Sequence, residues 1–377
     1  MKNILHISCD EKFIDMGINA FELAFPHCNK LLLVTDNTDI KHVIFAKREV
    51  VSRKELGGSN KNSDFWKGVD VIVLHSLFTF DLRIPDDIRV IWLGFGYDYY
   101  DFIFENKADL LSTKNKAFLD KVLINQASYK LKVKNFFKAL LLHDKRKNRK
   151  RRKIIERVDI FCPVLTSEYD AIHWPTSKKP KLMDWNYGTM EDNWAKDGSS
   201  RVNGNNVLLG NSATITCNHI DGIDLINQFE HHFKGKLIIP LSYGNQTYKE
   251  LIKDYLRNNF NGRSQVLEEF MPFDEYSKLI STCSLVVMPH KRQQGLGNIL
   301  MLLNSGAKVF LDKDNLLYKY LKDMGFVVYS LDEVTLNSLH DKLSEQKVEG
   351  NRRLLYKIWG REAIVEKTIT LVEGELA

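Results

Sequence analysis

The sequence has no long hydrophobic run and few cysteines. None of its apolar stretches approaches the ~18–20 residues that a membrane-spanning helix needs. The first residues, MKNILHISCD, include no apolar core of signal-peptide length. The cysteines are odd in number, widely separated and without a C-x-x-C pair, so we expect reduced thiols in a cytoplasmic protein rather than disulfides or a zinc site. They are Cys9, Cys28, Cys162, Cys217 and Cys283.

Two common nucleotide-binding motifs are also missing. There is no G-x-x-x-x-G-K-[ST] phosphate loop. A Gly-x-Gly at Gly295–Gly297 precedes an apolar segment, but Leu300 occupies the place of the third glycine of the dinucleotide fingerprint. The acidic pairs at 36–39 and 86–87 are better explained as turns than as metal ligands. We therefore predict no metal site.

The charge is unevenly distributed along the chain. A hydrophobic content of 44% and a charged content of 27% exclude a disordered or fibrous protein. The net charge of +6 hides a basic segment, in which twelve Lys or Arg between Lys130 and Lys153 meet one acidic residue, Asp144. This segment carries +11 and leaves −5 for the rest of the chain. An anionic partner is therefore expected for one region of an otherwise acidic protein.

Short apolar runs alternate with amphipathic segments, the pattern of parallel sheets covered by helices. The periodicity lapses between Thr176 and Asn206. We predict a Rossmann-like domain over 1–180, a linker over 181–204, a second Rossmann-like domain over 205–345, and a helical segment over 346–377 that packs back on the first domain. The predicted strands are Asn3–Ser8, Lys30–Asp36, Val69–Ser76, Arg89–Gly94 and Asp159–Val164, then Asn206–Gly210, Lys236–Leu241, Gln265–Met271, Leu285–Pro289 and Lys308–Asp312.

Three loops of the second domain follow predicted strands, where open α/β sheets bind ligands. The first is Gly210-Asn211-Ser212, and the second contains Tyr243-Gly244. The third runs from His290 to Asn298 and places the Gly-x-Gly at a helix N-terminus, where free amides and the helix dipole suit a diphosphate. A structural turn is the alternative for each loop. Basic and amide side chains before the glycines favour an anion site in the third loop.

In the first domain, a predicted strand runs into Gly96-Tyr97-Asp98-Tyr99-Tyr100. A carboxylate flanked by aromatic rings suits a general base whose pKa is raised by partial desolvation, with a turn aspartate among core tyrosines as the alternative. His75 ends the preceding strand, so we expect it to face the same cleft as Tyr97 and Tyr100.

The basic segment has apolar residues beside its lysines. Phe136 and Phe137 are among those interleaved with Lys134 and Lys138, which suits a helix lying on an anionic membrane. Nucleic acid is the rival partner, but no recognition module surrounds the segment. A solvated helix face is the third alternative. The residues assigned to a membrane patch are Lys138, Arg146, Lys147, Arg149, Lys150, Arg151, Arg152 and Lys153.

The loops together resemble those of a known family. Gly210-Asn211-Ser212, Asn218-His219-Ile220, Tyr243-Gly244-Asn245, Tyr276 and above all Arg292-Gln293-Gln294-Gly295-Leu296-Gly297 are similar to the bacterial TDP-N-acetylfucosamine:lipid II N-acetylfucosaminyltransferases, glycosyltransferase family 56. Gly96-Tyr97-Asp98 with Tyr100 resembles that family's Gly-Ala-Asp-x-Tyr. Ala213-Thr214 departs from the family's usual Gly-Asp.

The resemblance implies the GT-B fold, in which two Rossmann-like domains face across a cleft. It also implies transfer of a deoxyamino sugar from a dTDP donor to a polyprenyl-diphosphate-linked saccharide, on the inner face of the bacterial inner membrane. Asp98 is the expected catalytic group, and no metal or other cofactor is expected. The expected acceptor-side residues are His75, Tyr97 and Tyr100. The expected donor-binding residues are Gly210, Asn211, Ser212, Asn218, Tyr243, Gly244, Met271, Tyr276, Arg292, Gln293, Gln294, Gly295, Leu296 and Gly297.

Three alternatives stay open on the sequence. One is a GT-B transferase with a UDP or GDP donor and a different glycan acceptor. The second is a non-catalytic two-domain binding protein of the periplasmic type, which shares the outline of the fold. The third is a nucleic-acid-binding protein, against which we predict no nucleic-acid partner.

Overall fold

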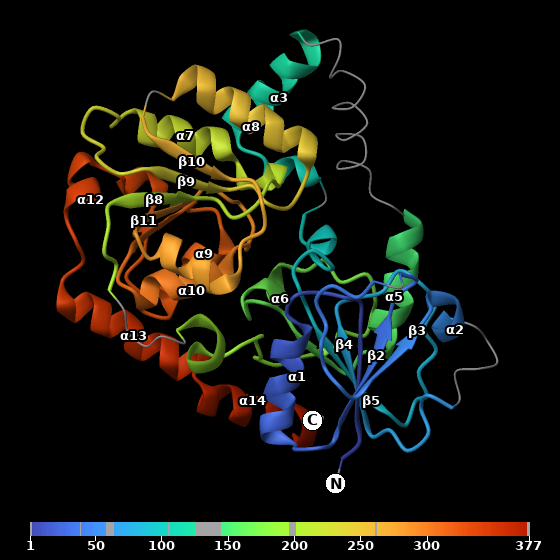
Figure 1. Ribbon diagram of the computed structural model, residues 1–377. Helices are drawn as coiled ribbons and strands as arrows, with labels where there is room; N and C mark the ends of the chain where they lie inside the picture. The colour runs from blue at the N-terminus through green and yellow to red at the C-terminus, as the bar shows by residue number, and fades with distance from the viewer. Residues whose placement is uncertain are drawn as a thin grey trace. The chain divides into compact units, whose positions relative to one another are not determined.

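The computed structural model describes residues 2–37, 39–57, 64–104, 106–125, 145–195, 201–260 and 262–374. The chain forms two compact units, each built on a parallel sheet with helices around it (Figure 1). Unit 1 comprises Met1–Glu105, His143–Lys196 and Tyr356–Ala377, and unit 2 comprises Asn106–Leu142 and Asp197–Leu355.

The sheet of unit 1 has the strand order β3-β2-β1-β4-β5-β6-β7, and all its pairs are parallel. The chain moves outward from β1 to β2 and β3, and then returns to the other side of β1 with β4. The loops after β1 and β4 therefore flank a topological switch point. The strands are β1 (Ile4–Ser8), β2 (Asn29–Val34), β3 (Arg48–Val51), β4 (Val71–His75), β5 (Arg89–Leu93), β6 (Ile160–Cys162) and β7 (Lys181–Leu182).

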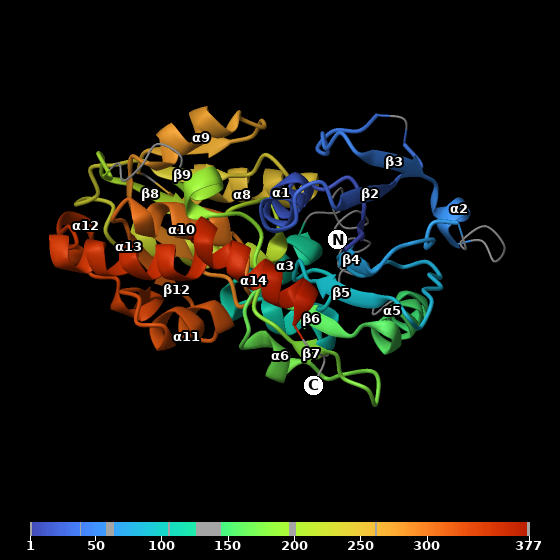
Figure 2. The ribbon, with the colours of Figure 1, turned by 90° about the horizontal axis from the view of Figure 1, so that it is seen from below.

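The C-terminal helix α14 (Arg361–Glu373) belongs to unit 1, where it packs on α1 (Ile14–Ala24) (Figures 1 and 2). Ile364 and Leu371 join the core that contains Phe21, and Trp185 Nε1 donates to Thr368 Oγ1 over 2.8 Å. The other helices of this unit are α2 (Arg53–Gly57), α5 (Lys145–Arg157) and α6 (Glu168–Ala171), with the short helices η1 (Tyr100–Phe102) and η3 (Met190–Trp194).

The sheet of unit 2 has the order β10-β9-β8-β11-β12-β13, again with parallel pairs. Its switch point lies between β8 and β11. The strands are β8 (Asn206–Leu209), β9 (Leu237–Pro240), β10 (Ser264–Leu267), β11 (Cys283–Met288), β12 (Lys308–Leu311) and β13 (Tyr329–Ser330). The helices are η2 (Lys107–Leu110), α3 (Thr113–Asn125), η4 (Ile215–Cys217), α7 (His219–Asn227), α8 (Gln246–Asn259), α9 (Phe273–Ile280), α10 (Leu296–Asn304), α11 (Leu316–Asp323), η5 (Leu331–Glu333), α12 (Leu336–His340) and α13 (Glu345–Trp359), whose last residues, from Tyr356, belong to unit 1.

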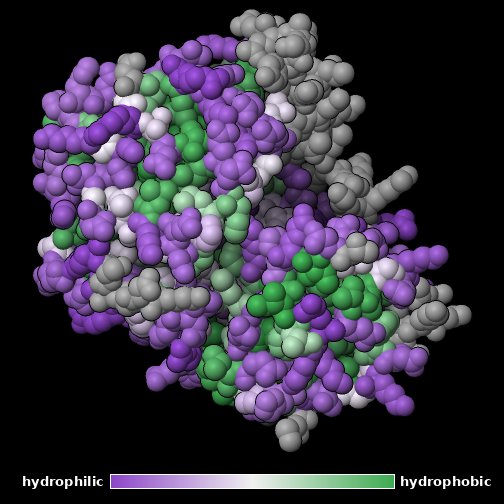
Figure 3. All heavy atoms as spheres, viewed as in Figure 1, coloured by the Kyte–Doolittle hydropathy of each residue, from purple (hydrophilic) through white to green (hydrophobic). Residues whose placement is uncertain are grey.

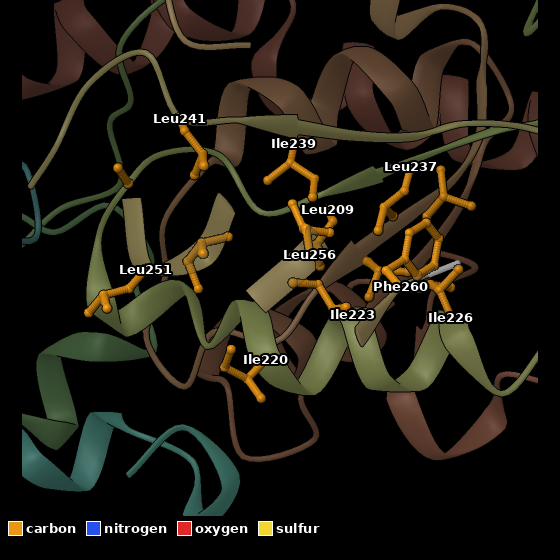
Figure 4. Packing of buried hydrophobic residues seen from close by; sticks show 14 of the residues in the cluster. Leu209, Ile220, Ile223, Ile226, Leu237, Ile239, Leu241, Leu251, Leu256 and Phe260 are labelled. Carbon is orange, nitrogen blue, oxygen red and sulfur yellow. The ribbon is translucent and has the colours of Figure 1, made fainter. Parts of the chain in front are cut away.

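The core of unit 2 forms where one face of the sheet meets α7 and α8. Leu209 and Ile239 of the strands face Ile223 of α7 and Leu256 of α8 (Figure 4). All four side chains are nearly or fully buried, and burying each such side chain stabilises the fold by about 1.5–3 kcal/mol. The face of the molecule in Figure 3 is largely hydrophilic, since most apolar side chains lie in such cores.

The predicted fold class, two doubly wound α/β domains, is confirmed. Three boundaries differ from the prediction. Residues 346–355 of the predicted C-terminal segment belong to unit 2, and only the residues from Tyr356 onward belong to unit 1. Residues 106–125 were assigned to the first domain, but α3 packs on α7 and belongs to unit 2. Much of the predicted 181–204 linker belongs to unit 1, because β7 pairs with β6 and Thr189 caps η3. The helix expected over Phe118–Leu142 is described only as far as Asn125, and its remainder lies outside the described residues.

Candidate donor site in unit 2 and acceptor residues in unit 1

The topology of unit 2 brings two of the predicted loops to its switch point. Gly210-Asn211-Ser212 follows β8, and the loop Pro289–Gly295 follows β11, which is the neighbour of β8 in the sheet. The remaining loop, which contains Tyr243 and Gly244, follows β9 on the other side of β8, and an isolated bridge joins Ala213 to Gly244. The three loops therefore meet at one edge of the sheet.

Helix α10 begins at this edge. Gly295 is its N-cap with φ +70°, a left-handed conformation that glycine adopts without strain. Leu296 and Gly297 form the first turn, whose backbone amides have no partner within the helix. The residues from Ile299 to Asn304 are buried. The sequence therefore anchors the helix in the core and aims its positive end at the loops, where an anion would be stabilised.

A hydrogen-bonded network fixes these loops to one another. Gln294 Nε2 donates to Asn211 Oδ1 over 3.1 Å and to Cys217 Sγ over 2.9 Å. Thr216 Oγ1 donates to Gln294 Oε1 over 3.0 Å, and Arg292 Nε lies 3.4 Å from the same hydroxyl. Gln294 is buried and Arg292 is half-buried. The network thus holds a guanidinium beside the N-terminus of α10.

Aromatic residues border the network. Asn211 Nδ2 donates to Tyr243 Oη over 3.0 Å, and Tyr243 is 49% exposed. Asn298 of α10 donates to Tyr276 Oη over 2.8 Å. Burial, with a smaller effect of Tyr243, raises the pKa of Tyr276 above its ordinary range. Both phenols therefore stay protonated at neutral pH and can donate hydrogen bonds. Met271 is half-buried in the segment between β10 and α9.

Besides Gln294, three predicted donor residues are more enclosed than the prediction assumed. Asn218 has no exposed surface and φ +50°, and its Nδ2 donates to Pro289 O over 2.9 Å and to Leu110 O over 3.1 Å. Ser212 is 2% exposed and shares a 2.8 Å hydrogen bond with Thr214. Gln293 is 6% exposed. Asn218 thus ties the segments behind the edge together instead of presenting its side chain at the surface.

Thr216, Cys217 and Asn298 belong to the site, but no motif in the sequence marks them. His219, for which the sequence predicted no role, is fully buried with Nδ1 3.1 Å from Tyr248 Oη. Burial lowers the pKa of His219 to about 3, so its imidazole is neutral. A Cβ on Gly210 would lie 2.8 Å from His219 Nε2, which explains why glycine stands at the end of β8.

In unit 1, Asp98 lies in the interior. Its Oδ2 accepts hydrogen bonds from Leu77 N over 3.0 Å and Trp92 Nε1 over 2.8 Å, and its Oδ1 accepts one from Phe95 N over 2.9 Å. The residue has no exposed surface. Burial raises the pKa of Asp98, and these hydrogen bonds oppose the shift. In this structure Asp98 therefore joins the ends of β4 and β5, and its carboxylate has no face open to an acceptor.

The other predicted acceptor residues separate into buried and exposed ones. His75 is buried, with Nε2 2.9 Å from His6 Nδ1 and Nδ1 2.7 Å from Tyr187 Oη. Burial lowers its pKa well below the ordinary value. Tyr100 is 5% exposed and donates to Glu168. Tyr97 is 48% exposed, so it is the one of the three that offers a surface to a ligand.

Helix α5 carries most of the predicted membrane patch. Arg149, Arg152 and Lys153 are exposed, and Lys150 is half-buried. Arg151 instead points inward, with Nη1 3.3 Å from Asp101 Oδ2. Lys138 lies outside the described residues, as do the side chains of Arg146 and Lys147.

Within the described ranges, no group of three or more His, Cys, Asp or Glu side chains is placed to hold a metal ion. Among the helices of those ranges, none combines the length and the apolar composition needed to cross a membrane.

The fold is similar to that of solved GT-B glycosyltransferases. The Anabaena protein Alr3699/HepE, solved with UDP and glucose, is 12% identical, with 100% of each chain covered and a TM-score of 0.64. WaaG, a glycosyltransferase involved in lipopolysaccharide biosynthesis, is 11% identical over 99% of this chain and 100% of its own, with a TM-score of 0.58. The sucrose-phosphate synthase of Thermosynechococcus elongatus is 10% identical over 98% of both chains, also with a TM-score of 0.58. These likenesses show that the chain has the GT-B fold, as the resemblance predicted.

A family match narrows the class. Residues 167–364, just over half of the chain, match the family described as 4-alpha-L-fucosyltransferase, glycosyl transferase group 56. The chain belongs to this family, so it is a nucleotide-sugar glycosyltransferase and not a non-catalytic binding protein. The predicted resemblance is confirmed.

Proposed function

We propose that the protein transfers a deoxyamino sugar, such as N-acetylfucosamine, from a dTDP-sugar to a polyprenyl-diphosphate-linked saccharide in surface polysaccharide assembly. The main support for binding of a nucleotide-sugar donor is the network of Gln294, Asn211 and Thr216 beside the N-terminus of α10. It offers a helix dipole, free backbone amides and the Arg292 guanidinium at one sheet edge, the combination that binds a diphosphate.

The same groups account for departure of the leaving group. As the bond between the anomeric carbon and the phosphate oxygen breaks, negative charge grows on the nucleoside diphosphate. The α10 amides and Arg292 would stabilise that charge without having to rearrange. Tyr243 and Tyr276 would donate hydrogen bonds to the sugar or the base. The segment around Met271, next to the 70%-exposed Phe270, would receive the base.

A UDP donor is the second candidate, because HepE, which shares the fold, was solved with UDP and with UDP-glucose. Thermal unfolding of the whole protein with dTDP, UDP and GDP distinguishes these donors. A nucleotide that binds the native state raises Tm, and at equal concentration the tighter ligand raises it more. We expect dTDP to raise Tm most. Transfer assays with the matching nucleotide sugar then test the reaction. If no nucleotide raises Tm and no sugar is transferred, the proposed function is wrong.

We propose that transfer needs no divalent metal, because the helix dipole and Arg292 perform the charge stabilisation that a metal supplies elsewhere. Purified enzyme treated with EDTA and then desalted is expected to keep its kcat within about twofold. Loss of activity with EDTA that Mg²⁺ restores would contradict this prediction.

We propose that α5 holds the protein to an anionic membrane, where a polyprenyl-linked acceptor resides. Its exposed Arg149, Arg152 and Lys153 would meet lipid phosphates, each contributing about 1 kcal/mol near the surface. The protein is expected to float with vesicles rich in anionic lipid and to dissociate as salt rises. Replacing these three residues with Gln should weaken flotation. Replacing Lys41, Lys54 and Lys67, which are also exposed in unit 1, removes the same charge and should leave flotation nearly unchanged. Equal effects of both triples would remove α5 from this role.

A further inference from the structure

The carboxyl edge of the unit 1 sheet has its own switch point, between β1 and β4. The loop after β1 comprises Cys9 to Phe13, and Ser76 begins the loop after β4. Ser76 has φ +79°, a strained conformation for a residue other than glycine. Such strain is concentrated at functional sites, and this edge is also where an open α/β sheet binds ligands.

Two carboxylates near this switch point, those of Asp98 and Asp10, are already occupied by the protein's own donors. Asp98 accepts from two backbone amides and an indole, as described above. Asp10 accepts from the backbone amides of Lys41, His42 and Val43 over 2.7, 3.0 and 3.0 Å. Burial is the largest single influence on Asp10 and acts to raise its pKa. The three hydrogen bonds act against burial, and on balance the pKa of Asp10 is lowered. A carboxylate held in this way is a poor proton acceptor, because its lone pairs already bind donors.

Glu11 differs from both. Within the described residues, no backbone N–H donates to its carboxylate, and the residue is half-buried, so it is neither enclosed nor fully solvated. The groups that act on it are the Tyr97 hydroxyl, the His42 ring and the charges of Asp10 and Lys12. Burial raises the pKa of Glu11, and the hydroxyl and the cations oppose the rise.

Tyr97 connects Glu11 to the strained serine. Its hydroxyl donates to Ser76 Oγ over 3.3 Å. The same hydroxyl lies close enough to Glu11 to lower the pKa of that carboxyl. Its ring stacks on Phe95 with the centroids 6.0 Å apart, and Phe95 stacks on Tyr187. An exposed aromatic ring beside a carboxylate is a surface on which a sugar ring can lie with one hydroxyl directed at the acid.

We propose that Glu11, and not Asp98, is the base that accepts the proton of the acceptor hydroxyl, with Tyr97 positioning it. In the transfer step the acceptor oxygen bonds to the anomeric carbon while the bond from that carbon to the nucleoside diphosphate breaks. The hydroxyl proton passes to the Glu11 carboxylate and then to solvent, and the electron pair of the broken bond leaves with the diphosphate. The inference rests on the proposed function, since it needs a hydroxyl acceptor.

The test compares Glu11→Gln with wild type in full-length enzyme, using the nucleotide sugar that wild type transfers. We expect kcat to fall about 10²–10⁴-fold, the usual contribution of a general base, while the donor KM and the nucleotide-induced rise in Tm stay within about twofold. Asp36→Asn is the matched control, because Asp36 is an exposed acid after the neighbouring strand β2 that pairs with Arg53. Its kcat should change less than twofold.

The pH profile separates a base from a residue that only supports the loop. Activity of wild type should fall as pH drops through the raised pKa of Glu11, because the protonated acid cannot accept the hydroxyl proton. That acid limb should disappear in Glu11→Gln, and Glu11→Asp should retain it with partial activity. A kcat of Glu11→Gln within fivefold of wild type, or an unchanged acid limb, would overturn the assignment while leaving the transferase function in place. Failure of wild type to transfer any nucleotide sugar would overturn both.

Discussion

Replacing Gly244 with alanine is expected to lower the free energy of unfolding of unit 2 by about 3 kcal/mol and to abolish measurable nucleotide binding. Gly244 has φ +117°, a conformation that residues with a Cβ rarely adopt. A Cβ there would also lie 2.6 Å from both the carbonyl carbon and the oxygen of Ala213. Neither obstacle can be relieved by turning a side chain, since both involve backbone.

The consequence reaches the donor site because Gly244 lies where two of its loops join. Ala213 N donates to Tyr243 O over 2.7 Å, and Asn245 N donates to Ala213 O over 2.8 Å. Separating these loop segments would move Tyr243 away from Asn211 and thereby loosen the network that Gln294 completes. The loss of binding should therefore exceed what the loss of stability alone produces.

Gly325→Ala is the matched control for this prediction. Gly325 is in the same unit with φ +89°, but among the described residues the only neighbour within 4 Å of a Cβ there is Leu354 Cδ1 at 3.8 Å, which is ordinary contact. It should cost only the backbone strain, about 1 kcal/mol, and leave binding intact. Urea unfolding and calorimetric titration with the nucleotide measure both effects. Equal losses in the two variants would mean that the Ala213 contact is unimportant.

How much of the fold the sequence predicts depends on how each element is buried. The central strands are apolar runs enclosed on both faces, so β1, β4, β8 and β11 were predicted to within about two residues at each end. The edge strand β3 was missed, because three of its four residues are exposed and give no apolar pattern. The two-residue β7 and β13 are too short for any periodicity to show.

The site shows the same division. Gly210, Tyr243 and Gln294 were predicted because each follows a strand and topology alone brings such loops together. Whether a polar side chain faces the ligand or the protein depends on tertiary contacts that spacing does not encode. Asn218 and Asp98 matched motifs in the sequence, yet both side chains are enclosed. Asn218 donates to carbonyl oxygens of segments distant along the chain, and Asp98 accepts from Trp92 of the strand that precedes it. Glu11 stands in no motif. It differs from Asp98 and Asp10 because backbone amides donate to those two carboxylates, whereas none within the described residues donates to its own.

Asp98→Ala is expected to lower the free energy of unfolding of unit 1 by about 3–5 kcal/mol. The change leaves Leu77 N, Trp92 Nε1 and Phe95 N without an acceptor, and each buried donor left unsatisfied costs about 1–3 kcal/mol before the structure relaxes. The residue has no exposed surface, so water does not reach these donors without local unfolding.

Asp10→Ala provides the comparison, because it also removes an acceptor of three N–H groups, those of Lys41, His42 and Val43. Asp10 is half-buried, and water can take the place of its carboxylate. We expect a loss of about 1–2 kcal/mol, measured for both variants by urea unfolding followed by circular dichroism. The difference between the variants measures burial, since the number of donors is the same. If Asp98→Ala were as stable as wild type and yet lost kcat, the carboxylate would act on the substrate, and the general base would be Asp98 rather than Glu11.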